Sequence, residues 1–169
     1  MLNIINNMQV FFEDCYRRLG VREYSRITKI SPPTASKILF EFRKQGLLLM
    51  EKERNYLLFY SNKENKNFID LSRIYWNNKL NEIVSYLDAN LVNPTIVLFG
   101  SLSKGEVLLN SDIDIAVFGS RKEIDLSGFE KKLKRKIQLF FFDSVKNIEN
   151  KELSNNILNG YILKGRLKL

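Results

Sequence analysis

The chain has 169 residues, with 27 lysines and arginines against 19 aspartates and glutamates, which gives a net charge of +8 and a pI near 9.5. This length accommodates one medium domain or two small ones, and the positive charge favours a polyanionic partner. A single cysteine and no histidine exclude an internal disulfide and a zinc site. No apolar run reaches the roughly 18 residues that span a bilayer, and a signal-peptide profile is lacking. We therefore expect a soluble, cytoplasmic protein without a membrane partner.

The chain begins with apolar residues at helical spacing, which predict a helix over residues 6–19 that ends at Gly20. Cys15 falls within this pattern, so we expect its side chain in the core. The apolar positions are Val10, Phe11, Tyr16 and Leu19.

Two further helices are predicted over residues 22–29 and 33–45. Ser31 can cap the second helix, in whose first turn proline is tolerated. Two short apolar runs, residues 47–50 and 56–60, then predict strands on either side of a polar tip. The buried stripe of the second helix is predicted to be Ile38, Leu39 and Phe42.

This order of three helices and a hairpin, with the segment SPPTASKIL and the ending Lys-Gln-Gly-Leu-Leu, resembles a winged helix-turn-helix domain. The resemblance implies binding of double-stranded DNA, with a recognition helix in the major groove and cations on phosphates. The alternative is a winged helix that contacts protein, with its cations solvated. The predicted DNA-binding residues are Thr34, Ser36, Lys37, Arg43, Lys44 and Arg54.

A long amphipathic helix is predicted from Phe68 to Leu87, after a polar entry at residues 61–67. It can join two domains, and it is the best candidate for the seam of a homodimer. Tyr75 and Trp76 at its centre suit core or dimer contacts better than base stacking.

The segment TIVLFGSLSKGEVLLNSDIDIAVFG, residues 95–119, carries the most specific chemistry. Its two β-branched runs predict buried strands. Gly100 permits a sharp turn at which its amide and that of Ser101 can point at a phosphate. Asp112 and Asp114 share a strand face, where they repel each other unless a cation lies between them. Ligands that are all oxygen suit Mg²⁺.

Gly-Ser, ten residues and then Asp-x-Asp resemble the signature of the DNA polymerase β-type nucleotidyltransferase superfamily, and the Ser-Asp-Ile-Asp-Ile form is similar to its minimal members. The resemblance implies that Gly100 and Ser101 contact the triphosphate of an NTP, with ATP favoured. It also implies that Asp112 and Asp114 hold Mg²⁺, or Mn²⁺ in its place. Lys104 matches a basic residue of the family, so it is either a phosphate contact or a solvated lysine. Related minimal nucleotidyltransferases modify HEPN-type toxins, which implies such a toxin as a partner.

The family has a third carboxylate on a later strand, and the apolar frame of the strand predicted over residues 136–143 places Gln138 at that position. Glutamine binds Mg²⁺ weakly and cannot act as a general base near neutral pH. Asp143 would lie about 16 Å farther along the strand at roughly 3.3 Å per residue. The sequence therefore leaves open both an active transferase and a nucleotide-binding domain without catalysis.

The rest of the C-terminal half is predicted to hold a basic helix over residues 126–136 and a strand that is buried on both faces at residues 140–142. Residues 152–165 resemble the closing helix and short tail of minimal nucleotidyltransferases. The basic cluster faces solvent, nucleic acid or a nucleotide phosphate, and consists of Lys131, Lys132, Lys134, Arg135 and Lys136.

The predicted fold class is α+β: a winged helix-turn-helix domain over residues 1–62, a linker helix over 63–92 and a small mixed-sheet nucleotidyltransferase domain over 93–169. One predicted function is the Mg²⁺-dependent transfer of an NMP group from an NTP to a hydroxyl. The other is a DNA-binding regulator or antitoxin whose transferase domain is inactive and binds nucleotide or mediates dimerisation.

Overall fold

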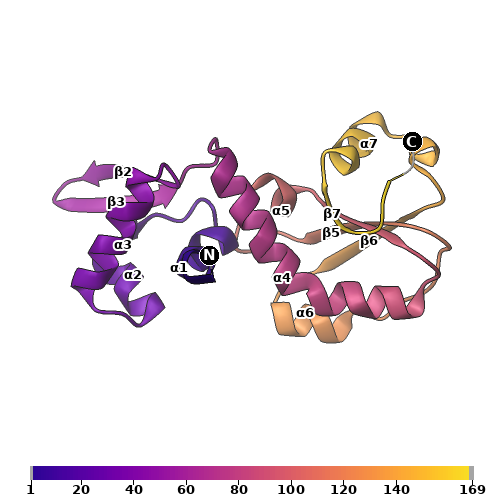
Figure 1. The fold of residues 1–169 in the computed structure, drawn as a ribbon, viewed down its shortest axis with the longest axis horizontal. Helices are drawn as coiled ribbons and strands as arrows, with labels where there is room; N and C mark the ends of the chain where they lie inside the picture. The colour runs from indigo at the N-terminus through magenta and orange to yellow at the C-terminus, as the bar shows by residue number, and fades with distance from the viewer. Residues whose placement is uncertain (1, 168–169) are drawn as a thin grey trace. The chain divides into compact units, whose positions relative to one another are not determined.

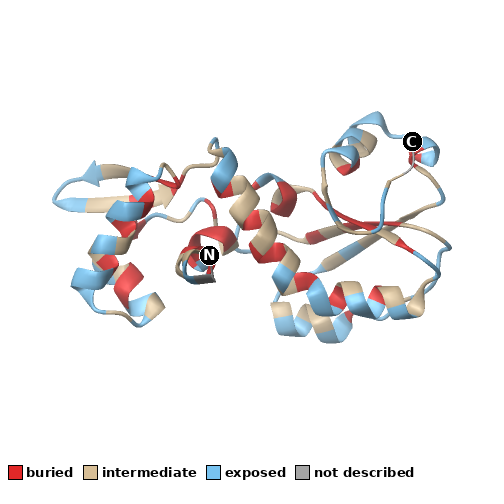
Figure 2. Ribbon diagram, in the orientation of Figure 1, coloured by how far each residue is buried: buried red, intermediate tan, exposed pale blue. Residues whose placement is uncertain are grey.

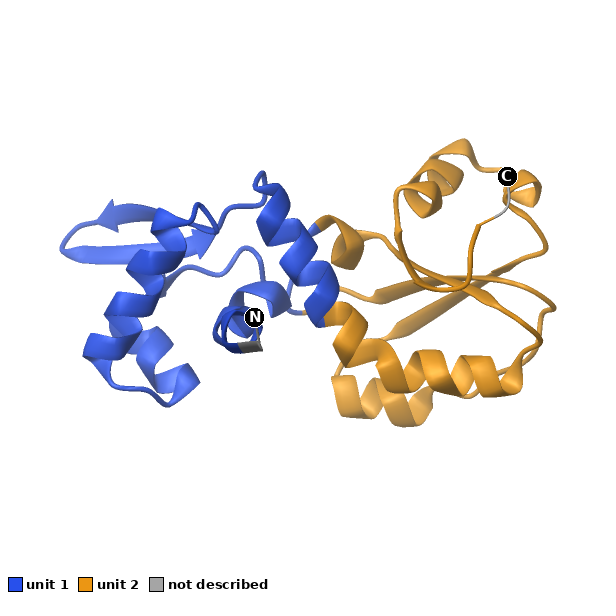
Figure 3. Cartoon of the chain, in the orientation of Figure 1, with its two compact units in different colours: residues 1–75, 105–109 blue, residues 76–104, 110–169 orange. Residues whose placement is uncertain are grey.

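The computed structural model describes residues 2–167, which form two compact units (Figure 3). Unit 1 contains the chain up to Tyr75 together with Gly105–Leu109. Unit 2 contains Trp76–Lys104 and the chain from Asn110 onward. The border between Tyr75 and Trp76 falls within the long helix. Of the helices that the structure describes, none combines the length and apolar character that crossing a bilayer requires.

Unit 1 is built from three short helices, a three-stranded antiparallel sheet in the order β1-β3-β2, and the beginning of a long helix (Figure 1). The elements in chain order are α1 (Leu2–Glu13), β1 (Leu19–Gly20), α2 (Val21–Thr28), α3 (Pro32–Lys44), β2 (Leu48–Glu53), β3 (Tyr56–Ser61) and α4 (Lys66–Asn90).

The start of α3 follows directly from its sequence. The Ser31 side chain accepts a hydrogen bond from the backbone amide of Thr34. Pro32 and Pro33 occupy the first two helical positions, where a backbone N–H has no acceptor within the helix. At the other end, Gly46 takes a left-handed φ of 73° and turns the chain toward β2.

The first helix ends at Glu13, so the prediction of a helix that continues to Gly20 is wrong. A turn follows, in which the Asp14 carboxylate accepts a hydrogen bond from the amide of Tyr16. Leu19 and Gly20 then form a short strand that pairs with β3. Cys15 is buried in this turn, whereas Tyr16 is 49% exposed. Cys15 and Leu19 are apolar because tertiary contacts bury them, and not because they share a helical face. Their spacing nevertheless matches that of a helix, which is why the sequence predicts a helix here.

The core of unit 1 gathers aromatic side chains from α1, α2, β3 and α4. Buried residues along the ribbon are red in Figure 2. Phe12 meets Phe68 with ring centroids 5.4 Å apart. Tyr24 is fully buried and satisfies its hydroxyl by donating to the carbonyl of Asn7 at 2.8 Å. Burial raises the pKa of Tyr24 to about 12. The largest buried side chains are Met8, Phe11, Phe12, Tyr24, Phe59 and Phe68.

Unit 2 has a mixed four-stranded sheet in the order β6-β5-β4-β7, in which only the β5–β6 pair is parallel. The C-terminal part of α4, together with α6, lies on one side of this sheet, and α7 lies on the other (Figure 1). After α4, the elements are β4 (Thr95–Phe99), α5 (Ser101–Lys104), β5 (Ile113–Phe118), α6 (Ser127–Leu133), β6 (Ile137–Phe142), a 3-10 turn (Val145–Asn147), α7 (Lys151–Leu158) and β7 (Tyr161–Lys164).

Three predictions for unit 2 are corrected by the structure. Tyr161–Lys164 is not a tail but a strand that pairs with β4. Strand β6 lies at an edge of the sheet, so its phenylalanines are half-buried instead of enclosed on both faces. The basic helix ends at Leu133, and Arg135 beyond it is 9% exposed, so it does not belong to an exposed cationic face.

Candidate functional site

Three neighbouring strands bring one row of side chains together at one end of the sheet in unit 2, where β4 ends and β5 and β6 begin. Asp114 on β5 pairs with Phe99 on β4 and with Gln138 on β6. Asp112 lies directly before β5, and its Oδ2 accepts a hydrogen bond of 2.7 Å from Nε2 of Gln138. The side chain of Gln138 is therefore in contact with the Asp-x-Asp pair.

The turn from β4 into α5 brings Gly100 against the carboxylate of Asp114. Gly100 has a left-handed φ of 69°, and a β-carbon at this position would overlap Oδ2 of Asp114. The hydroxyl of Ser103 donates to the carbonyl of Gly100 at 2.9 Å and closes the turn. Ser101, the first residue of α5, is half-buried beside it. Only a residue without a side chain fits here, because Oδ2 of Asp114 occupies the place that a β-carbon would take.

The two aspartates form an acidic pair that a cation would neutralise. Burial, and after it the charge of Asp112, raise the pKa of Asp114 above its ordinary value. Among residues 2–167 no group of three or more histidine, cysteine or acidic side chains is placed to hold a metal ion. Two carboxylates completed by phosphate oxygens and water are the ligand set that Mg²⁺ commonly takes in phosphoryl-transfer sites. The residues present therefore fit a Mg²⁺ ion that arrives with a nucleotide.

Lys104, the predicted phosphate contact, lies at the end of α5. Its ammonium group donates to the Oδ1 of Asn156 on α7 at 2.8 Å. The lysine is exposed, so its ammonium group is accessible to an anion at this turn as well as to Asn156.

Arg135 is a residue near this site that sequence reasoning assigned to a basic surface cluster. Its guanidinium donates to the carbonyl of Ser111 at 2.6 Å and lies over the ring of Trp76, 5.2 Å from the centroid. The sequence carried no signal for this difference, because Arg135 lies four residues after Lys131, at helical spacing, within the helix predicted over residues 126–136.

The six predicted DNA-binding residues all lie in unit 1, whereas the five predicted nucleotide and metal residues lie in unit 2. On α3 the fully buried residues Ala35 and Leu39 point inward. Of the predicted DNA-binding residues on this helix, Thr34, Lys37, Arg43 and Lys44 are exposed and Ser36 is half-buried. The hydroxyls of Thr34 and Ser31 are hydrogen-bonded at 2.8 Å, and Arg54 occupies the β2–β3 turn with a φ of 52°.

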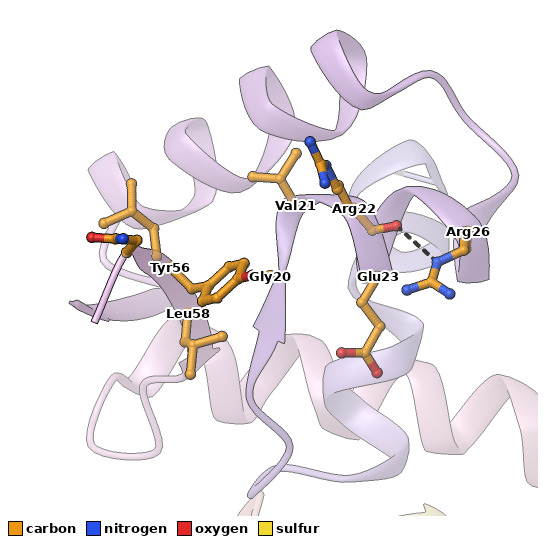
Figure 4. A pocket seen from close by; sticks show the side chains of 9 residues that line it. Gly20, Val21, Arg22, Glu23, Arg26, Tyr56 and Leu58 are labelled. Carbon is orange, nitrogen blue, oxygen red and sulfur yellow. Dashed lines mark hydrogen bonds between the residues drawn. The ribbon is translucent and has the colours of Figure 1, made fainter. Parts of the chain in front are cut away.

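A groove of about 660 Å³ in unit 1 lies between the start of α2 and the β2–β3 hairpin (Figure 4). Arg22 and Arg26 line it from α2, while Tyr56, 69% exposed, lines it from β3. The third charged lining residue, Glu23, is paired with Arg17 at 3.0 Å. The groove is therefore net cationic with an apolar floor.

The model of the family described as "Nucleotidyltransferase domain" matches residues 78–164, just over half of the chain. The match includes the turn at Gly100, the Asp-x-Asp pair and Gln138, and it leaves α1 to β3 uncovered. None of the curated proteins compared with the chain matches it.

Proposed function

The chain belongs to the nucleotidyltransferase domain family, and from this premise we propose that unit 2 binds an NTP, with ATP favoured, and transfers its NMP group to a hydroxyl acceptor. The observation that carries the proposal is the close approach of the Gly100 turn to Asp114 of the Asp-x-Asp pair, at one end of the sheet. A backbone turn without a side chain admits a phosphate, and the acidic pair suits the cation that accompanies it.

In this reaction the acceptor oxygen bonds to the α-phosphorus, the bond from that phosphorus to the β-bridging oxygen breaks, and pyrophosphate leaves with the electron pair. Mg²⁺, or Mn²⁺ in its place, would neutralise charge on the phosphates and align them. Asp112 and Asp114 would hold the ion, and the amides of Gly100 and Ser101 would contact the triphosphate. Gln138 orients Asp112 but cannot accept the proton of the hydroxyl, which would pass to water.

For unit 1 we propose a winged helix-turn-helix domain that binds double-stranded DNA. Its three helices and antiparallel hairpin occur in the order that such a domain requires, and the exposed half of α3 carries Lys37, Arg43 and Lys44. In this proposal α3 enters the major groove with Thr34 and Ser36 near its start, and Arg54 at the hairpin turn contacts phosphate.

A second candidate function is a DNA-binding regulator or antitoxin whose transferase domain no longer catalyses transfer. Gln138 favours it, because an amide replaces the third carboxylate of the family beside Asp112. In this version unit 2 binds nucleotide or mediates homodimer formation, and a HEPN-type toxin is the proposed protein partner. Label transfer separates the two candidates.

The test is transfer of label from α-labelled ATP with Mg²⁺ or Mn²⁺, using cell extract as the source of acceptors. The control is the double variant Asp112→Asn with Asp114→Asn. Label that appears on protein or RNA and disappears in the control supports the transferase. Nucleotide binding without any transfer supports the regulator, whereas absence of nucleotide binding contradicts the transferase and leaves the regulator only its role in homodimer formation.

DNA binding is tested separately by fluorescence anisotropy on duplex DNA over a series of salt concentrations. Replacement of Lys37 and Arg43 by alanine should weaken binding and reduce the magnitude of the salt slope by about 1 for each lost phosphate contact. The matched control replaces Lys146 and Lys151, exposed lysines of unit 2, and should change the slope little. Equal slopes for both double variants would contradict the assignment of α3 as the recognition helix.

A further inference from the structure

Arg135 is a buried cation in the segment that joins α6 to β6. Only 9% of its surface is exposed, and its guanidinium lies 5.2 Å from the centroid of Trp76, which is fully buried. Burying a guanidinium in a protein is unfavourable unless aromatic faces and hydrogen-bond acceptors compensate it. Here one such acceptor is the carbonyl of Ser111, at 2.6 Å. The guanidinium therefore lies next to the residue that immediately precedes Asp112.

The segment from Arg135 to Gln138 holds Asp112 at three points. Before Asp112, the carbonyl of Ser111 accepts a hydrogen bond from Arg135. After it, the amide of Ile113 donates to the carbonyl of Lys136 at 2.8 Å. The carboxylate itself accepts a hydrogen bond from Gln138. Two of these points belong to the β5–β6 ladder and its side-chain register, whereas the bond from Arg135 lies outside the ladder.

We propose that Arg135 is a positioning residue that sets the direction of the Asp112 carboxylate for a Mg²⁺–nucleotide complex. The proposal rests on the nucleotide site of the proposed function. The peptide plane between Ser111 and Asp112 is fixed by the bond to its carbonyl oxygen, and this plane determines where the side chain of Asp112 begins. The rigid, planar guanidinium stacked on Trp76 is suited to this task, because its N–H groups have fixed directions.

Hydrogen-bond partners that orient metal-binding groups typically change metal affinity by about 10- to 100-fold when they are removed. We expect Arg135→Met to raise the Mg²⁺ concentration needed for half-maximal nucleotide binding about tenfold or more. Arg135→Lys keeps the charge but offers a flexible ammonium, so a smaller increase, about threefold, is expected. The control Arg121→Met removes an exposed arginine of the same unit and should leave the Mg²⁺ requirement unchanged.

The experiment titrates Mg²⁺ into the full chain with a fluorescent ATP analogue whose α–β bridge is methylene, so that binding is measured without turnover. Near-ultraviolet circular dichroism and thermal unfolding establish the folded fraction of each variant. A residue with a merely structural role would lower the melting temperature without changing the Mg²⁺ requirement of the folded protein.

The outcomes separate this inference from the proposed function. If the wild-type chain shows no Mg²⁺-dependent nucleotide binding, the proposed function fails and the inference fails with it. If the wild type binds and folded Arg135→Met needs the same Mg²⁺ concentration, the inference alone is overturned. Where Arg135→Met does not fold, Arg135→Lys decides: an unchanged Mg²⁺ requirement overturns the positioning role, and an increased one supports it.

Discussion

Gln138 places a neutral amide, and not a third carboxylate, beside the two aspartates of the candidate site. It contacts Asp112 and lies in register with Asp114. We predict that Gln138→Glu lowers the Mg²⁺ concentration for half-maximal nucleotide binding about tenfold, since a third carboxylate adds an anionic ligand. The rate of label transfer should rise as the Mg²⁺ requirement falls. Asn81→Asp, which adds the same charge on the exposed surface of α4, should change neither quantity. An unchanged Mg²⁺ requirement in Gln138→Glu would mean that this position does not face the ion.

Asp114 should make the stability of the metal-free protein depend on pH. Burial and the charge of Asp112 raise its pKa above 3.8 in the folded state, so the folded protein binds more protons than the unfolded chain between 3.8 and the raised value. Stability therefore falls as the pH rises through this window. Asp114→Asn removes the effect and should stabilise the metal-free protein at pH 7, by at most about 1 kcal/mol because solvent screens a half-exposed pair.

Urea unfolding without Mg²⁺ at pH 7 and near pH 4 measures this difference between Asp114→Asn and the wild type. The advantage of the variant should be largest at pH 7 and should shrink as the pH approaches 3.8. A variant that is less stable than the wild type at pH 7 would contradict the assigned cause.

At the scale of elements, the turn between β4 and α5 tolerates no side chain at Gly100. In Gly100→Ala the alanine would have to adopt a left-handed φ, and its methyl group would overlap the carboxylate of Asp114. We expect a loss of about 1 to 3 kcal/mol in the free energy of unfolding, together with loss of Mg²⁺–nucleotide binding. Gly128→Ala is the matched control, because its β-carbon in α6 would meet nothing within 4 Å and helical alanine is favoured by about 0.5 to 1 kcal/mol.

Urea unfolding and nucleotide titration of the two glycine variants test this directly. Opposite signs of the stability change are expected. Equal effects on nucleotide binding would show that the turn, although strained by a side chain, does not form the phosphate contact.

Elements whose boundaries have a local chemical cause were predictable from the sequence. The strands at Thr95–Phe99 and Ile113–Phe118 are β-branched runs, and α3 begins at a serine followed by prolines. The errors came from non-local causes. Residues 14–20 are buried by tertiary contacts, and Tyr161–Lys164 becomes a strand only by pairing with β4, more than sixty residues earlier in the chain. The role of Arg135 was missed because its ring and carbonyl partners are likewise distant in sequence.

At the scale of the whole molecule, the backbone passes between the two units three times. It does so once within α4 and twice around Gly105–Leu109, a segment that belongs to unit 1. In unit 1 the carbonyl of Val107 accepts a hydrogen bond of 2.7 Å from the amide of Cys15, and Val107 is fully buried. The segment therefore ties the packing of unit 1, through a short covalent connection, to Asp112 in unit 2.

This connection predicts that a change in unit 1 alters nucleotide binding without touching the site. Val107→Ala should cost about 2 kcal/mol of stability in unit 1, because it leaves a cavity. Cys15 reports this loss: burial raises the pKa of its thiol to about 11, so a thiol reagent reacts only when unit 1 opens. Faster Cys15 labelling and a higher Mg²⁺ requirement for nucleotide are expected together. Val92→Ala, at a residue that is 81% exposed in unit 2, should change neither. Faster labelling with unaltered nucleotide binding would show that the segment transmits nothing from unit 1 to Asp112.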